Sequence, residues 1–253
     1  MKPSVHKSMV NVQCAMGSQG RQQGLSLVEL MISLVVGLIL IAAAFNMYMG
    51  NSRSARFTEG LQAIQENGRY GISVLQRDFR LAGFSAVRGI AGEIEAFDFE
   101  NSDEDKLTIQ TRQPYDCNGQ ATTPTDGLAV NTYTLNTTTK ELTCKGNQDD
   151  NSSMPIVEGV EQFRVLYGID DDDDPSTCQP KRYVPYADTL QSSQIVSLRF
   201  ALLVNSGKPI RTRGVSETFM ILDAPYTSPN DRLVREVFSS TVLLRNNSSC
   251  ISL

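Results

Sequence analysis

One apolar segment near the N-terminus constrains this chain more than any other feature. The segment Leu25–Phe45 is almost entirely apolar and, extended to Met49, has roughly the length of a helix that spans a bilayer. Its polar residues are Ser26, Glu29 and Ser33. The residues before it carry three basic side chains and no acid, namely Lys2, Lys7 and Arg21. The positive-inside rule therefore predicts a cytoplasmic N-terminus and a C-terminal part on the other side of the membrane.

Two ordinary explanations of this segment are incomplete. It exceeds the core of a secretory signal peptide, and no small-x-small cleavage site follows it apart from the weak candidate at 42–44. A plain membrane anchor leaves Glu29 unexplained, because a carboxylate inside a membrane helix costs about 2.5 kcal/mol or more. An acidic residue in that position indicates that the carboxylate has a function.

The residues around this glutamate resemble a known processing signal. The sequence Gly24-Leu-Ser-Leu-Val-Glu-Leu30 is similar to the type IV prepilin signature. The resemblance implies that a membrane peptidase cleaves after Gly24, that the new amine of Leu25 is methylated, and that the apolar helix is retained. Leu25 stands where phenylalanine is commoner in that family. The leader is also long, so translation from Met16 is an alternative start.

The same resemblance gives Glu29 a role as the fifth residue of the mature chain. In the family, this glutamate neutralises the N-terminal amine of a neighbouring subunit when the helices pack into a filament. This role is physically reasonable, because burying two opposite charges costs less free energy when they are paired than when each is buried alone. We therefore expect Glu29 to guide assembly.

Composition excludes most catalytic chemistry. The only histidine is His6, so a chain cleaved after Gly24 has none, which excludes Ser-His-Asp triads, Cys-His pairs and histidine metal sites. Residues 25–253 include 20 basic and 28 acidic residues, a net charge of −8, and no basic stripe, so nucleic acid is not expected as a partner. A membrane-anchored hydrolase would need carboxylate or Ser-Lys chemistry, and no spacing indicates either. We expect the chain not to be an enzyme.

A helical pattern continues beyond the apolar segment. Apolar and small residues recur at a three/four spacing, which predicts one helix from about Ser26 to Leu81, ended by Gly83. Asp78 and Arg80 are expected to form a structural ion pair with the sheet. The predicted stripe consists of Phe57, Leu61, Ile64, Gly68, Gly71, Leu75, Phe79 and Ala82.

From residue 106 onward the pattern is typical of strands separated by turn residues. A long helix packed on an antiparallel sheet is an α+β arrangement and is the pilin-like fold that the resemblance implies. The chain then divides into a leader at 1–24, a transmembrane half-helix at 25–49, its amphipathic continuation at 50–83 and a β-rich periplasmic or extracellular domain at 84–253. The predicted strands are 106–111, 128–135, 140–144, 161–167, 195–204, 217–222 and 233–245.

Three further segments of the sequence resemble the PilW group of minor pilins: Leu75–Phe84, Val160–Asp170 and Leu233–Asn246. The resemblance implies a minor pilin that helps to initiate assembly of the type IV pilus and is incorporated at or near its tip. Piliation, twitching motility and adhesion are the activities it would support. The alternative is a J-like minor pseudopilin of a type II secretion system.

The implied partners are other minor pilins, the major pilin, the prepilin peptidase and the inner-membrane assembly platform. The implied location is the inner membrane, with a single pass and the C-terminal domain in the periplasm. After assembly, the protein would lie in the pilus at the cell surface.

Four cysteines remain once the leader with Cys14 is removed, an even number that suits two disulfides in an oxidising compartment. Of three pairings we favour Cys117–Cys144 with Cys178–Cys250. The first bridge would staple a long irregular loop and contribute about 3–4 kcal/mol.

No cofactor is expected. The alternate carboxylates Asp170, Asp172 and Asp174 are weak calcium candidates, because they lack the glycine and the closing glutamate of an EF-hand. A run of adjacent carboxylates is more often a solvated loop.

Overall fold

A computed structural model shows a chain made of two compact units, Met1–Gly50 and Asn51–Leu253. The structure describes residues 24, 26–85, 94–103, 105–123, 127–148, 152–170, 178–187 and 189–246. The first unit contributes the N-terminal half of a long helix, and the second contributes its C-terminal half together with all the strands. The expected α+β arrangement is confirmed.

The helix α1 runs from Leu27 to Arg80, within one residue of the predicted bounds at each end. A turn follows, and Gly83 adopts a φ of +74°, a conformation that a residue with a side chain rarely takes. The N–H of Gly83 donates a hydrogen bond to the carbonyl of Gln110 at 2.9 Å, so the chain leaves the helix directly onto the first sheet. Glycine therefore ends the helix, as the sequence predicts.

The strands form two four-stranded sheets and a hairpin, where the sequence predicted one sheet. All neighbouring strands pair antiparallel. The first sheet has the order β1 (Lys106–Arg112), β2 (Leu128–Asn136), β3 (Glu141–Lys145) and β4 (Met154–Glu158). The second has the order β10 (Arg235–Leu243), β7 (Ile195–Asn205), β5 (Val160–Ile169) and β6 (Arg182–Val184). The hairpin joins β8 (Thr218–Ile221) to β9 (Ala224–Thr227), and a 3-10 turn, Ser192–Gln194, precedes β7.

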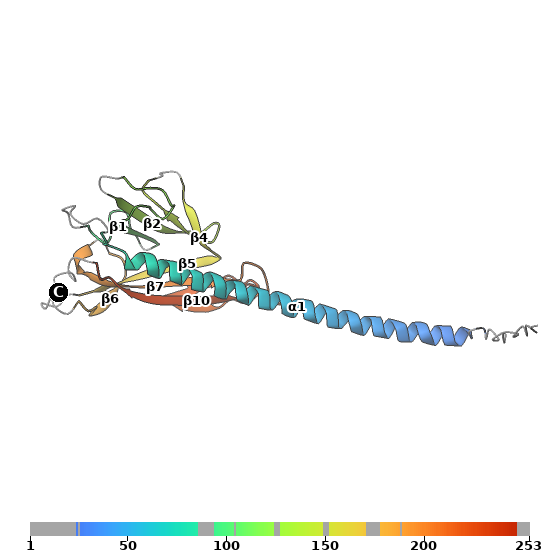
Figure 1. Cartoon of the computed structure of the whole chain (residues 1–253). Helices are drawn as coiled ribbons and strands as arrows, with labels where there is room; N and C mark the ends of the chain where they lie inside the picture. Colours follow the sequence, from blue (N-terminus) through green and yellow to red (C-terminus); the bar gives the residue numbers. More distant parts are fainter. Residues whose placement is uncertain are drawn as a thin grey trace, which may run out of the picture. The chain divides into compact units, whose positions relative to one another are not determined.

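The C-terminal half of α1 packs against both sheets (Figure 1). The ring of Phe79 makes edge-on contacts with Tyr133 of β2 and Phe200 of β7, at centroid distances of 5.4 and 5.0 Å. Close approach depends on glycine, because a Cβ at Gly71 would lie only 2.8 Å from Val157 and 2.9 Å from Leu202. The helix thus connects the core of one sheet to that of the other.

The buried stripe of α1 begins later than predicted. Phe57 and Leu61 are exposed, whereas burial starts at Gly60, which lies against Ile210. The prediction for these two residues is wrong, because the contact that begins the buried stripe is made at Gly60 and leaves Phe57 and Leu61 outside it. The buried helix residues are Gly60, Ile64, Gly68, Gly71, Leu75 and Phe79.

The hairpin β8–β9 covers part of the second sheet with a small core of its own. Ile221 of β8 is buried with Ala201 and Leu203 of β7. Arg164 of β5 forms an ion pair with Asp223 in the hairpin turn, with Nε and Oδ1 2.6 Å apart. The second sheet is therefore apolar on both faces along β7, which explains the nearly continuous apolar sequence of that strand.

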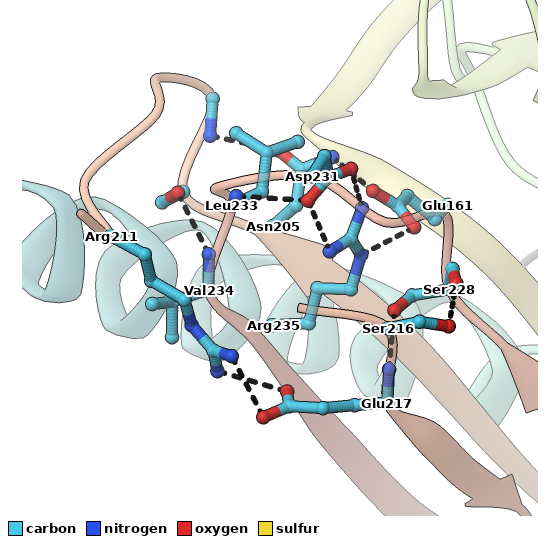
Figure 2. Close-up of polar contacts among 12 residues, drawn as sticks. Glu161, Asn205, Arg211, Ser216, Glu217, Ser228, Asp231, Leu233, Val234 and Arg235 are labelled. Atoms are coloured by element: carbon cyan, nitrogen blue, oxygen red, sulfur yellow. Dashed lines mark hydrogen bonds and ion pairs between the residues drawn. The ribbon is translucent and has the colours of Figure 1, made fainter. Parts of the chain in front are cut away.

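A buried charged cluster joins β5 to the segment before β10 (Figure 2). Arg235 and Glu161 are only 2% and 4% exposed, and the Arg235 Nε donates to the Glu161 carboxylate at 2.8 Å. The same guanidinium donates twice to Asp231, at 2.9 and 2.5 Å. Asn205 and Tyr226 donate to the remaining lone pairs of Glu161, at 2.8 and 3.1 Å. The buried charges are thereby paired and hydrogen-bonded, as burial requires.

Candidate functional site: the processing and assembly segment

The N-terminal half of α1 exposes its apolar side chains on every face. Large hydrophobic residues from Leu27 to Tyr48 are exposed, and none of the apolar window is buried within the chain. In the part of the chain that the structure describes, α1 is the one helix long and apolar enough to cross a membrane. So large an apolar surface requires lipid or other helices around it.

Glu29 lies in the first turn of this exposed helix. The backbone N–H groups of a helix N-terminus lack intrahelical acceptors and favour an anion there. The Ser33 hydroxyl donates to the backbone carbonyl of Glu29 at 2.7 Å and does not contact the carboxylate. Within the described ranges, no cation lies at ion-pair distance from that carboxylate. Among the described residues, Glu29 therefore has no counter-charge.

The predicted cleavage site lies immediately before the helix. Gly24 and Ser26 are exposed and precede the first helical residue, Leu27, and a Cβ at Gly24 would meet no atom within 4 Å. Leu25, the predicted methylated residue, and the leader 1–23 lie outside the described residues. Gly24 is therefore accessible, which suits a peptidase substrate.

The predicted bridge between Cys117 and Cys144 is confirmed, with a Cα–Cα distance of 6.3 Å. It ties the loop after β1 to β3. Cys178 is disulfide-bonded as well, and Cys250, which the sequence pairs with it, lies outside the described residues.

The calcium hypothesis stays a prediction. Asp170 follows β5 and accepts a hydrogen bond from the backbone N–H of Gln179 at 3.2 Å. Asp172 and Asp174 lie outside the described residues. Over those ranges, no group of three or more histidine, cysteine or acidic side chains could hold a metal ion.

The predicted ion pair between the helix end and the sheet takes another form. The Asp78 carboxylate pairs with its neighbour Arg77 at 3.0 Å and accepts a hydrogen bond from the Tyr133 hydroxyl at 2.9 Å. Burial, and then the Asp78 charge, raise the pKa of Tyr133 well above its usual range, so this phenol keeps its proton and donates it. Arg80 is bonded through its backbone, since its carbonyl accepts a hydrogen bond from the Asn246 amide at 3.0 Å.

Comparison with known proteins gives two family matches on separate parts of the chain. The model of the prokaryotic N-terminal methylation motif matches residues 19–45, which include Gly24 and Glu29. The model of type IV pilus-assembly protein W matches residues 128–246, from β2 to the end of the described chain. A solved structure, a type IV-like pilin from Thermus thermophilus, aligns at 15% identity and a TM-score of 0.42 over 73% of this chain and 98% of that one. No protein of curated function matches.

The motif and the exposed helix define the class: this is a membrane-anchored, single-pass type IV pilin with a C-terminal globular part. The match to the PilW model over residues 128–246, together with the methylation motif, supports a minor pilin of the type IV pilus. Proteins of this kind are structural subunits, which associate with other pilins and with the pilus machinery of the membrane.

Proposed function

We propose that this protein is a minor pilin that helps to start assembly of the type IV pilus and is incorporated at or near its tip. It acts without catalysis, after cleavage behind Gly24 and methylation of the Leu25 amine. One observation carries the proposal: the Glu29 carboxylate, which has no cation beside it among the described residues, lies in the first turn of an exposed apolar helix that matches the methylation motif.

Assembly follows from the charge and the exposed surface. The helix leaves the bilayer only if other helices cover its apolar side chains, since water would not. Glu29 can join that helical bundle at low cost only with an opposite charge, and the methylated amine of a neighbouring subunit supplies one. The pairing fixes the axial register of the incoming subunit, because a displaced helix would leave both charges unpaired.

The PilW match supports the pilus rather than the pseudopilus of a type II secretion system. The direct partners would be other minor pilins, the major pilin and the assembly platform of the inner membrane. The proposed activities are support of piliation and twitching motility. Loss of twitching in a deletion strain, with protein secretion unaffected, is the result that this assignment predicts, and the reverse pattern would contradict it.

A Glu29→Gln variant tests the assembly role. The change keeps the size and hydrogen-bonding capacity of the side chain and removes its charge. We expect cleavage to remain normal and piliation to fall at least about tenfold, since a lost pairing of about 1.4 kcal/mol or more has that effect. Immunoblots report the size of the protein, and sheared-pilus yields report assembly.

Ser33→Ala is the matched control, because it lies one turn along the same helix and lacks a charge. It should leave piliation unchanged. Normal piliation in the Glu29→Gln strain would show that the carboxylate has no role in assembly.

A further inference from the structure

A groove lies between the last turns of α1 and the first sheet. It has a volume of about 760 Å³, within the range of small-molecule sites. Its lining comes from α1, from β1, β2 and β4, and from the loop that carries Cys117. Neither the processing site nor Glu29 lies in it, so its presence is not explained by the assembly role.

Exposed apolar side chains gather along this groove. Tyr70 of α1 and Tyr115 of the loop after β1 line it and are 56% and 59% exposed, and Met154 of β4 is 52% exposed. Among the described tyrosines outside the membrane segment, Tyr70 and Tyr115 are the exposed ones, since the others are buried or half-buried. Both therefore offer exposed aromatic surface to whatever enters the groove, from two different elements.

Polar groups lie among these rings. Thr111 of β1 is almost completely buried, and within the described part of the chain its hydroxyl has no hydrogen-bond partner. A buried hydroxyl without a partner is destabilising, so a ligand or water in the groove that hydrogen-bonds to it binds more favourably. Asn131 of β2 uses its carboxamide oxygen to accept from the Cys117 N–H at 2.9 Å, and no partner of its amide nitrogen is found in the same ranges.

The charged side chains of the groove already have partners within the protein. Arg77 is paired with Asp78. The Asp116 carboxylate accepts from three backbone N–H groups of the surrounding loops, those of Asn118, Gln120 and Gln148. These three side chains leave the groove a formal charge of −1, which disfavours an anionic ligand.

An added peptide strand fits this groove poorly. The strand that borders it, β4, is the edge of the first sheet and contains Pro155, which has no N–H to donate to a neighbouring strand. Exposed aromatic side chains, scattered donors and acceptors and no excess of positive charge match a neutral ligand that carries hydroxyl groups on one side and C–H groups on the other. We propose that this groove binds a neutral saccharide.

The disulfide keeps one wall of the groove in place. Cys117 lines the groove, and its bond to the buried Cys144 anchors the loop that presents Tyr115. A site held in its binding conformation loses less entropy when it binds.

Titration of the full-length protein with neutral oligosaccharides tests the proposal. The protein is kept in a polyoxyethylene detergent, because maltoside and glucoside detergents carry the proposed ligand chemistry. Chitotriose, maltotriose and lactose are the probes, and saturation-transfer NMR and calorimetry report binding. We expect at least one probe to bind with a Kd of about 1 mM or lower.

Tyr70→Ala and Tyr115→Ala should each weaken that binding about tenfold, the effect of losing one ring contact. Phe57→Ala is the matched control, since Phe57 is an exposed aromatic residue on the same helix and does not line the groove. Circular dichroism checks that each variant is folded. Three results would overturn the proposal: no binding of any of the three probes, binding as tight as that of the unmodified protein in both tyrosine variants, or binding of an anionic sialyl-lactose alone.

The saccharide site and the assembly role can fail separately. A Tyr70→Ala strain should assemble normal pili, whereas Glu29→Gln protein should bind saccharide normally. Loss of pili in the Tyr70→Ala strain would show that the groove packs against another pilin and would overturn the saccharide proposal alone.

Discussion

At the residue scale, the buried ion pairs around Arg235 are the feature that sequence reading could not find. Arg235 and Glu161 are 74 residues apart in the chain. The residues that flank each of them in the sequence are those of an ordinary strand and do not indicate a buried charge. Only the antiparallel order of β10, β7 and β5 brings them together. Asn205 of β7, which lies directly opposite Arg235, completes the cluster.

Removal of the guanidinium should therefore destabilise the protein strongly. Arg235→Met leaves Glu161 buried without a cation, and we expect the free energy of unfolding to fall by about 3–5 kcal/mol. Urea denaturation followed by near-ultraviolet circular dichroism of the tyrosines measures it. Arg211→Met is the control, because its pair with Glu217 is partly exposed and should contribute about 1 kcal/mol at most. Equal losses in the two variants would contradict this account.

The carboxylates that face arginines also predict a loss of stability in acid. Hydrogen bonds from Arg235 and Arg211 lower the pKa of Asp231 and of Glu217 in the folded chain. The unfolded chain then takes up protons first as the pH falls, so the stability that these groups contribute is present above about pH 4 and is lost below it.

Unfolding measured between pH 7 and pH 3 tests this dependence. The free energy of unfolding should change little down to about pH 5 and fall below about pH 4. In Arg211→Met the fall should be shallower, because the pKa of Glu217 then returns toward its usual value. An unchanged slope would exclude this pair as a source of the acid sensitivity.

At the scale of elements, the long apolar and amphipathic patterns were predictable, and so were the short strands β3 and β8. The helix and the strands β5, β7 and β10 follow from sustained periodic or apolar runs. The strands β4, β6 and β9 were missed, since two of them contain a proline and the third has three residues. The division into two sheets depends on how α1 is shared between them, which no local pattern specifies.

Glycine in the second half of α1 sets the distance between the helix and the sheets. Alanine would favour the helix by about 1 kcal/mol, but at Gly71 its Cβ would meet Val157 and the buried Leu202. We expect Gly71→Ala to lower the free energy of unfolding by about 1–3 kcal/mol, because overpacking outweighs helix propensity. Gly50→Ala is the control, since a Cβ there meets no atom within 4 Å, and it should be neutral or slightly stabilising. A stabilised Gly71→Ala protein would show that the contact is loose.

The groove illustrates the same limit of sequence reading. Tyr70 and Tyr115 belong to different elements, and nothing in their spacing indicates that they share a groove. The Cys117–Cys144 pairing, in contrast, was predictable from the number of cysteines and the loop between them.

At the scale of the whole molecule, the two units have different requirements. The first exposes an apolar helix with one carboxylate, and the second has a folded core with a bridged loop and buried charges. The first unit needs neighbours in a membrane or a filament, whereas the second buries its own apolar side chains. A filament subunit requires this difference, since only the helix must leave a lipid environment and pack against other proteins during assembly.

The N-terminal residue of the protein isolated from membranes tests the central claim most directly. Mass spectrometry of its N-terminal peptide should find a methylated Leu25 as the first residue, with Glu29 fifth. A Gly24→Ala strain should retain the leader and accumulate a slower-migrating precursor. A purified chain that begins at any other residue, or that begins beyond the apolar helix, would contradict the account.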